Sequence, residues 1–321
     1  MVKTNQTISL IEKDSLKGRD FLTLLDYSSE EVAYLVQLAY DMKQDTLAGK
    51  TPDILAGKTL GMIFEKNSTR TRISFEVGMI QLGGHGIFMN ARDLQIGRGE
   101  SVSDTGKVLS EFLDGVMIRA KSHKMVEELA EHTTVPVING LTDLFHPCQA
   151  MADLLTIKEV KGDLKGLKLS YIGDGNNVAH SLVIAGAHMG MHVSVATPKG
   201  YEYHSGLFEK AKKIAELNGG SVTSTYDPIE SSTDADAIYT DTWTSMGQEE
   251  EAAQRLIDFK DFQINDQLVG HAKKDYVFLH CLPAHREEEV STSVIDGKNS
   301  YVFQQAGNRL HAQKAVIASL L

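Results

Sequence analysis

Residues 65–76, EKNSTRTRISFE, concentrate hydrogen-bond donors and positive charge where an apolar strand gives way to a helix. Ser68 suits the N-cap position, and a helix N-terminus presents unpaired N–H groups and partial positive charge. Thr69, Arg70 and Thr71 add donors at the same point. A phosphate dianion requires many donors and bidentate Arg contacts. The segment therefore predicts an anion site, and the alternative is a capped helix with two solvated arginines.

The segment FHPCQ opens a second predicted helix. Pro147 fits the first helical position, with His146 at the entrance and Gln149 one turn further on. A histidine and a glutamine at this spacing could bind a neutral carbonyl group and its amide. A surface histidine that caps the helix is the alternative interpretation.

The segment GDGNN follows a predicted strand and raises the possibility of dinucleotide binding. Gly173 and Gly175 match that fingerprint, but Val178 occupies the place of its third glycine. The next strand also lacks the acidic residue that binds a ribose. A nicotinamide cofactor is therefore disfavoured, while Asn176 and Asn177 offer amides to a polar ligand.

The segments DTWTSMG and HCLPAHREEEV each follow a strand. Asp241 could hold an amine, with Cys281 beside it. Cys281 with His280 and His285 raises a zinc hypothesis, although a closed structural zinc site requires four ligands. A cysteine-nucleophile hydrolase is a further alternative. A binding role is favoured over both, and no metal is predicted.

Strands and helices alternate along the chain, which predicts an α/β fold with parallel sheets. The helix that begins at Ser68 carries Ile73, Val77 and Ile80 at helical spacing, and Ile73 and Val77 are predicted to anchor it in the core. Ligands of such sheets lie beyond the carboxyl ends of the strands, where all the segments above fall. The predicted strands are 58–64, 85–89, 115–120, 135–139, 168–174, 192–198, 237–243 and 276–283.

The composition limits the class of protein. At 321 residues the chain is long enough for two domains, predicted at 1–150 and 151–304. A net charge of −11 gives no general affinity for nucleic acid. The two cysteines have no CxxC spacing, which favours a reducing, cytoplasmic compartment. No apolar stretch approaches the ~20 residues of a membrane helix, and no signal peptide is apparent.

Together these motifs resemble the aspartate/ornithine carbamoyltransferase family, most closely its ornithine-specific branch, from about residue 30 to the C-terminus. The resemblance implies two domains, each a parallel sheet flanked by helices, with the active site in the cleft between them. It also implies that the C-terminal helix, about 305–321, joins the first domain. The matching motifs are Ser68-Thr69-Arg70-Thr71-Arg72, His146-Pro147-Cys148-Gln149, Asp241 with Ser245-Met246-Gly247, and His280-Cys281-Leu282-Pro283.

The resemblance further implies transfer of a carbamoyl group from carbamoyl phosphate to L-ornithine without a cofactor, in a homotrimer or a multiple of trimers. It assigns catalysis to Arg119, His146, Asp241 and Cys281. It assigns ornithine binding to Asn177, Asp241, Ser245 and Met246. The residues that it assigns to carbamoyl phosphate are Ser68, Thr69, Arg70, Thr71, Gln95, Arg119, His146, Gln149, Cys281, Leu282 and Arg309.

Other substrates and classes stay open at this point. Acetylornithine or putrescine could be the amine, although the Ser-Met-Gly motif favours unmodified ornithine. An aspartate enzyme is expected to carry His-Pro-Leu-Pro where HCLP stands here. A non-catalytic binding protein would not need Arg119, His146 and Gln149 around the carbonyl group.

Overall fold

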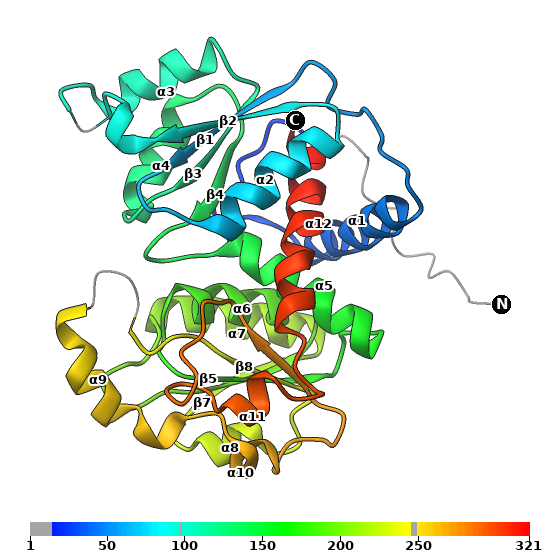
Figure 1. Cartoon of the computed structure of the whole chain (residues 1–321), viewed down its shortest axis with the longest axis vertical. Coiled ribbons are helices and arrows are strands. Elements are labelled where there is room, and N and C mark those ends of the chain that lie inside the picture. Colours follow the sequence, from blue (N-terminus) through cyan, green and yellow to red (C-terminus); the bar gives the residue numbers. More distant parts are fainter. Residues whose placement is uncertain (1–14, 97, 245–248) are drawn as a thin grey trace. The chain divides into compact units, whose positions relative to one another are not determined.

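The chain forms two compact units in this computed structural model. Unit 1 comprises Met1–Ala152 with Arg309–Leu321, and unit 2 comprises Asp153–Asn308. Each contains one parallel sheet with helices on both faces, which confirms the predicted α/β class (Figure 1). No helix in the part of the chain that the structure describes is long and apolar enough to cross a membrane. The described residues are 15–96, 98–244 and 249–321.

Unit 1 is built on four parallel strands in the order β2-β1-β3-β4. The four strands predicted for this half of the chain are confirmed within a few residues. The strands are β1 (Thr59–Phe64), β2 (His85–Asn90), β3 (Gly115–Arg119) and β4 (Val137–Leu141). The helices that carry or cover the site are α1 (Ser29–Leu47), α2 (Thr69–Gln81), α3 (Val102–Ser110), α4 (His123–His132), α5 (Pro147–Lys161) and α12 (Val302–Leu320).

The buried face of α2 differs from the prediction. Ile73 and Ile80 are 54% and 64% exposed, whereas Phe75 and Met79 are fully buried. Both sets of residues recur at helical spacing, so periodicity alone could not choose between them. Close packing decides which face of α2 is buried. Gly78 lies on the buried face, where an added Cβ would lie 3.3 Å from Cγ of Lys314 on α12. The expectation that Ile73 anchors the helix in the core is therefore wrong, and Val77 is only partly buried.

Unit 2 is built on five parallel strands in the order β7-β6-β5-β8-β9. Four were predicted and β7 was not. In Figure 1, α6 and α7 lie on one side of this sheet and α8 and α10 on the other. The strands are β5 (Lys168–Ile172), β6 (His192–Ala196), β7 (Ser221–Thr225), β8 (Ala237–Thr240) and β9 (Val277–His280). The helices are α6 (Asn177–His188), α7 (Ser205–Asn218), α8 (Pro228–Ser232), α9 (Ala252–Asp258), α10 (Asp266–Val269) and α11 (Thr292–Ile295).

The strand order reverses once in each sheet, between β1 and β3 in unit 1 and between β5 and β8 in unit 2. In open α/β sheets, ligands bind beyond the carboxyl ends of the strands at such a reversal. The register places Phe64 beside Arg119 at the first reversal. In unit 2, Thr240 of β8, a strand that borders the second reversal, lies beside His280 of β9. The residues that follow these strand ends are therefore the place to look for a site.

Candidate active site

The N-terminus of α2 lies directly after β1, at the reversal in unit 1. Ser68 is the N-cap, and its Oγ accepts a hydrogen bond from the Thr71 backbone N–H at 3.2 Å. The backbone N–H of Glu65 donates to the Arg119 carbonyl at 2.9 Å, which fixes this loop against the end of β3. Thr69 and Arg70 are the first two helical residues. The first turn thus presents its N–H groups at the carboxyl edge of the sheet.

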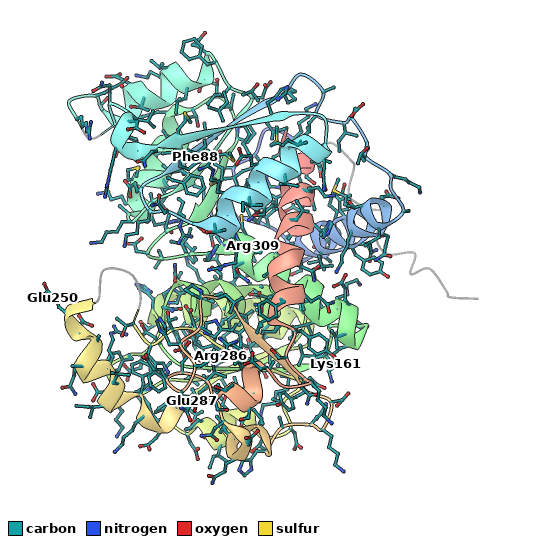
Figure 2. All side chains as sticks on the ribbon, viewed as in Figure 1. Phe88, Lys161, Glu250, Arg286, Glu287 and Arg309 are labelled. Carbon is teal, nitrogen blue, oxygen red and sulfur yellow. The ribbon has the colours of Figure 1, made fainter. Side chains whose placement is uncertain are left out.

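Arg309 links three segments of unit 1 that lie far apart in the sequence. Its Nη1 donates to Gln149 Oε1 at 2.8 Å, and its Nη2 donates to Thr71 Oγ1 at 3.3 Å. Arg309 comes from α12, as Figure 2 shows, whereas Gln149 comes from α5 and Thr71 from α2. All three side chains are at most 2% exposed. Three residues predicted to bind one ligand are therefore in direct contact.

His146 lies within the same group of residues. It is 5% exposed, and its pKa is held well below the ordinary value of 6.5. Burial is the main cause, and the positive charges of Arg309, Arg119 and Arg70 act in the same direction. A neutral imidazole can donate a hydrogen bond to a carbonyl oxygen, and guanidinium groups favour an anion. The group combines the two properties that a phosphorylated carbonyl compound requires.

Two further predicted residues of unit 1 differ in their placement. Arg119 is the last residue of β3 and is 6% exposed. Gln95 lies in a loop after β2 and is exposed. Its place among the carbamoyl-phosphate contacts stays a prediction from the sequence.

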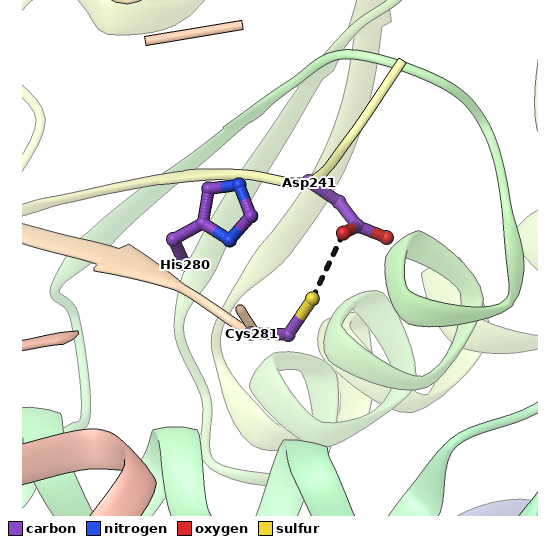
Figure 3. A group of neighbouring side chains, drawn as sticks. All are labelled: Asp241, His280 and Cys281. Atoms are coloured by element: carbon purple, nitrogen blue, oxygen red, sulfur yellow. Dashed lines mark hydrogen bonds between the residues drawn. The ribbon is translucent and has the colours of Figure 1, made fainter. Parts of the chain in front are cut away.

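Asp241 and Cys281 come together at the carboxyl edge of the sheet in unit 2. Because Thr240 and His280 are register partners on parallel strands, the next residue of each strand is adjacent. Cys281 Sγ donates to Asp241 Oδ1 at 2.8 Å (Figure 3). The proximity of these two side chains was predicted, and the strand register explains it.

Asn176 holds the carboxylate of Asp241. Asn176 is the N-cap of α6, and its Oδ1 accepts from the backbone N–H groups of Val178 and Ala179. Its Nδ2 donates to Asp241 Oδ2 at 2.8 Å. Asn177 is the first helical residue. The sequence indicated that both amides could bind a ligand, and the N-cap position after β5 places Asn176 at Asp241.

Sequence reasoning missed a buried ion pair beside this group. Arg255 Nη1 donates to Asp174 Oδ2 at 2.8 Å and to the Trp243 carbonyl at 2.9 Å. The two charged side chains are 5% and 7% exposed. Burial raises the pKa of Asp174, and the Arg255 charge opposes that shift. Their separation in the sequence left no local signal of the pair.

Three predicted residues remain. Leu282 follows Cys281, and its backbone N–H donates to His280 Nδ1 at 2.9 Å. Ser245 and Met246 lie outside the described residues.

The zinc hypothesis is tested by the hydrogen bonds of His280. Donor atoms of Asp241, His280 and Cys281 all lie within 4.8 Å of one another. However, His280 Nδ1 accepts from Leu282, and its Nε2 lies 3.0 Å from Glu289 Oε1. A metal ion would have to displace one of these bonds to use the imidazole. The remaining two donors are fewer than the four of a closed structural zinc site.

Comparison with known proteins identifies the family. The carbamoyl-P binding domain of the aspartate/ornithine carbamoyltransferases matches residues 19–159, and their Asp/Orn binding domain matches residues 165–320. The chain belongs to the aspartate/ornithine carbamoyltransferase family. This confirms the resemblance predicted from the motifs.

Individual members of the aspartate/ornithine carbamoyltransferase family resemble the chain over nearly its whole length. An ornithine carbamoyltransferase of Anoxybacillus flavithermus is 61% identical over 95% of the chain and 98% of its own length. One of Bacillus subtilis is 59% identical over 97% and 96%. The solved structure of the ornithine carbamoyltransferase from Pyrococcus furiosus superposes with a TM-score of 0.93 at 56% identity, over 95% of this chain and 98% of that one.

Proposed function

We propose that this carbamoyltransferase transfers the carbamoyl group of carbamoyl phosphate to the δ-amine of L-ornithine, which yields L-citrulline and phosphate. The carrying observation is the contact of Arg309 with Gln149 and Thr71 at the start of α2, where burial and the charges of Arg309, Arg119 and Arg70 hold the pKa of His146 well below its ordinary value. Relatives that share 55–61% of the residues are ornithine carbamoyltransferases, which supports this choice of amine. The activity serves arginine metabolism.

Carbamoyl phosphate binds in unit 1 in this proposal. The N-terminus of α2 and the Arg70 guanidinium hold the phosphate, which is the ligand that a helix N-terminus with an arginine suits. Arg119 and His146 face the carbonyl oxygen, and Gln149 contacts the carbamoyl amide. The further contacts proposed are Ser68, Thr69, Thr71, Gln95, Cys281, Leu282 and Arg309.

Ornithine binds in unit 2. The carboxylate of Asp241, held by Asn176 and Cys281, favours and orients an amine. Asn177 contributes an amide at the start of α6. Ser245 and Met246 remain predictions from the sequence motif.

The reaction proceeds by addition and elimination. The lone pair of the neutral δ-amine forms a bond to the carbonyl carbon, and the carbonyl oxygen becomes an oxyanion. Arg119, His146 and the Thr71 hydroxyl stabilise that charge, which is the largest contribution in many acyl-transfer sites. The C–O bond to phosphate then breaks, phosphate departs with the electron pair, and it accepts the proton of the amine. Holding both reactants in the enzyme supplies the proximity that the bimolecular step requires.

The assembly and location belong to the same proposal. We expect a homotrimer or a multiple of trimers in the cytoplasm, with no cofactor. The trimer is supported by the resemblance to the family. The cytoplasmic location is supported by the two cysteines, which have no CxxC spacing and form no disulfide within the described residues.

Citrulline formation with a panel of amines tests the function. The purified enzyme is incubated with carbamoyl phosphate and, separately, L-ornithine, N-acetylornithine, putrescine, L-lysine or L-aspartate. We expect kcat/KM for ornithine to exceed that for every other amine by at least about 100-fold, because binding sites discriminate strongly against ligands that leave buried polar groups unpaired. A higher kcat/KM for acetylornithine or putrescine would replace ornithine as the substrate.

A further inference from the structure

His280 and Glu289 form a buried pair behind the Asp241–Cys281 contact. His280 Nε2 lies 3.0 Å from Glu289 Oε1, and both side chains are fully buried. The same Oε1 accepts a hydrogen bond from the His285 backbone N–H at 2.6 Å. The reaction described above uses neither side chain. A buried carboxylate that contacts no substrate requires another explanation.

The hydrogen bonds of the imidazole define its tautomer. Leu282 N–H donates to His280 Nδ1 at 2.9 Å, so Nδ1 is the acceptor and carries no proton. The proton is therefore on Nε2, which donates to Glu289 Oε1. The partner of one ring nitrogen decides the state of the other. Removal of the Glu289 acceptor would favour the tautomer with a proton on Nδ1, which would face the N–H of Leu282.

The bond to Leu282 matters because of the backbone at that residue. Leu282 has φ of 58°, in the left-handed region that non-glycine residues rarely adopt. Such a conformation persists only where its surroundings hold it. Cys281 lies between His280 and Leu282, and its thiol donates to Asp241 at 2.8 Å. The ring of His280 thus fixes both ends of the segment that places the thiol.

We propose that Glu289 is a positioning residue, which acts through the tautomer of His280 to hold Cys281 and Leu282 against Asp241. The inference rests on the proposed function, since it assigns these three residues to the site. It extends that function to a carboxylate eight residues beyond Cys281. Glu288, its neighbour, has a half-exposed side chain and provides a matched control.

The test compares four variants by steady-state kinetics and by alkylation of Cys281. Glu289→Leu removes the acceptor at similar volume, whereas Glu289→Gln retains an oxygen that can accept both N–H groups. Glu288→Gln removes the same charge from the exposed position. Iodoacetamide reports the segment directly, because Cys148, the other cysteine, is fully buried and burial raises its pKa to about 12. Cys281→Ser provides the blank for alkylation.

Glu289→Leu is expected to lower kcat/KM for ornithine about 10- to 100-fold. Its Cys281 should be alkylated at least about fivefold faster, because the thiol no longer lies against Asp241. Glu289→Gln should recover most of both properties, and Glu288→Gln should match the wild type. An unchanged alkylation rate in Glu289→Leu would overturn the proposal, as would equal losses in Glu289→Leu and Glu288→Gln.

A second pair of variants applies if Glu289→Leu does not fold. In His280→Asn, the side-chain oxygen can still accept from Leu282 N–H. In His280→Gln, the amide reaches toward Glu289 and leaves that N–H without its acceptor. We expect His280→Asn to retain at least about tenfold more activity with ornithine. Equal or reversed activities would contradict the positioning role. Alkylation requires no substrate. Absence of citrulline formation by the wild type would therefore overturn the proposed function, while the alkylation rates would still test the positioning role of Glu289.

Discussion

The two clusters at the carboxyl edges of the sheets use one backbone arrangement for opposite charges. Each lies at the reversal of a parallel sheet and beside a helix with a side-chain N-cap, Ser68 in unit 1 and Asn176 in unit 2. In unit 1, burial and the charges of three arginines hold the pKa of His146 well below its ordinary value. In unit 2, an amide, a thiol and a backbone N–H all donate to the carboxylate of Asp241. The fold supplies the place, and a few side chains decide which ligand suits it.

The largest expected effect is the loss of the positive charge at the start of α2. Arg70→Ala should lower kcat/KM for carbamoyl phosphate at least about 1000-fold, since it removes charge-assisted hydrogen bonds to the phosphate in the ground and transition states. Steady-state citrulline formation measures the change, and circular dichroism checks the fold.

Arg72→Ala is the matched control for this variant. Arg72 lies two residues further along α2, where its Nε is 3.3 Å from Glu76 and its guanidinium stacks 3.9 Å from the Phe88 ring centroid. Its half-exposed ion pair should contribute little, so kcat/KM should change less than about fivefold. Equal losses in the two variants would remove the distinction between them and the phosphate assignment with it.

The next effect concerns the carboxylate of unit 2. Asp241→Asn retains the shape but removes the charge that attracts the amine. We expect kcat/KM for ornithine to fall about 100-fold and KM for carbamoyl phosphate to stay within about threefold. Initial rates with each substrate varied in turn separate the two constants. Normal saturation by ornithine in this variant would exclude Asp241 from the amine site.

Eight of the nine strands could be predicted from apolar runs, because central parallel strands are buried on both faces. The exception, β7, reads SVTST, a polar run in which only Val222 is buried. The buried face of α2 could not be predicted either. Which of two helical stripes is buried depends on α12, more than 230 residues later.

The site shows a similar limit. Local motifs indicated Ser68, Arg70, His146 and Asp241, because helix termini and strand ends carry a recognisable pattern. The family resemblance added Arg309. Buttressing contacts such as Asn176 to Asp241 depend on strand order, which no local motif encodes.

His146 provides a comparison in stability rather than rate. Its pKa in the folded protein lies below the ordinary value of 6.5, so between these two values the unfolded chain binds more protons. Stability should therefore rise with pH through that window and be level above it, with a slope of up to about 1.4 kcal/mol per pH unit from this group. Urea unfolding of the wild type and His146→Gln at several values between pH 5 and pH 8 measures the slope. An equally steep slope in both proteins would show that the pKa of His146 in the folded protein is not lowered.

The two N-caps give the smallest expected effect and the closest comparison of the units. Ser68→Ala removes one cap bond, to the Thr71 N–H, and should cost about 1 kcal/mol. Asn176→Ala removes bonds to two backbone N–H groups and the donor to Asp241, and should cost about 2 kcal/mol.

The single tryptophan, Trp243, lies in unit 2, so its fluorescence follows that unit during urea unfolding while circular dichroism follows both. Asn176→Ala should lower the fluorescence midpoint, and Ser68→Ala should lower the dichroism midpoint with a smaller effect on fluorescence. If both variants shift both signals equally, the units unfold together and the caps differ only in size. A larger loss in Ser68→Ala than in Asn176→Ala would contradict the view that the cap of unit 2 also supports its carboxylate.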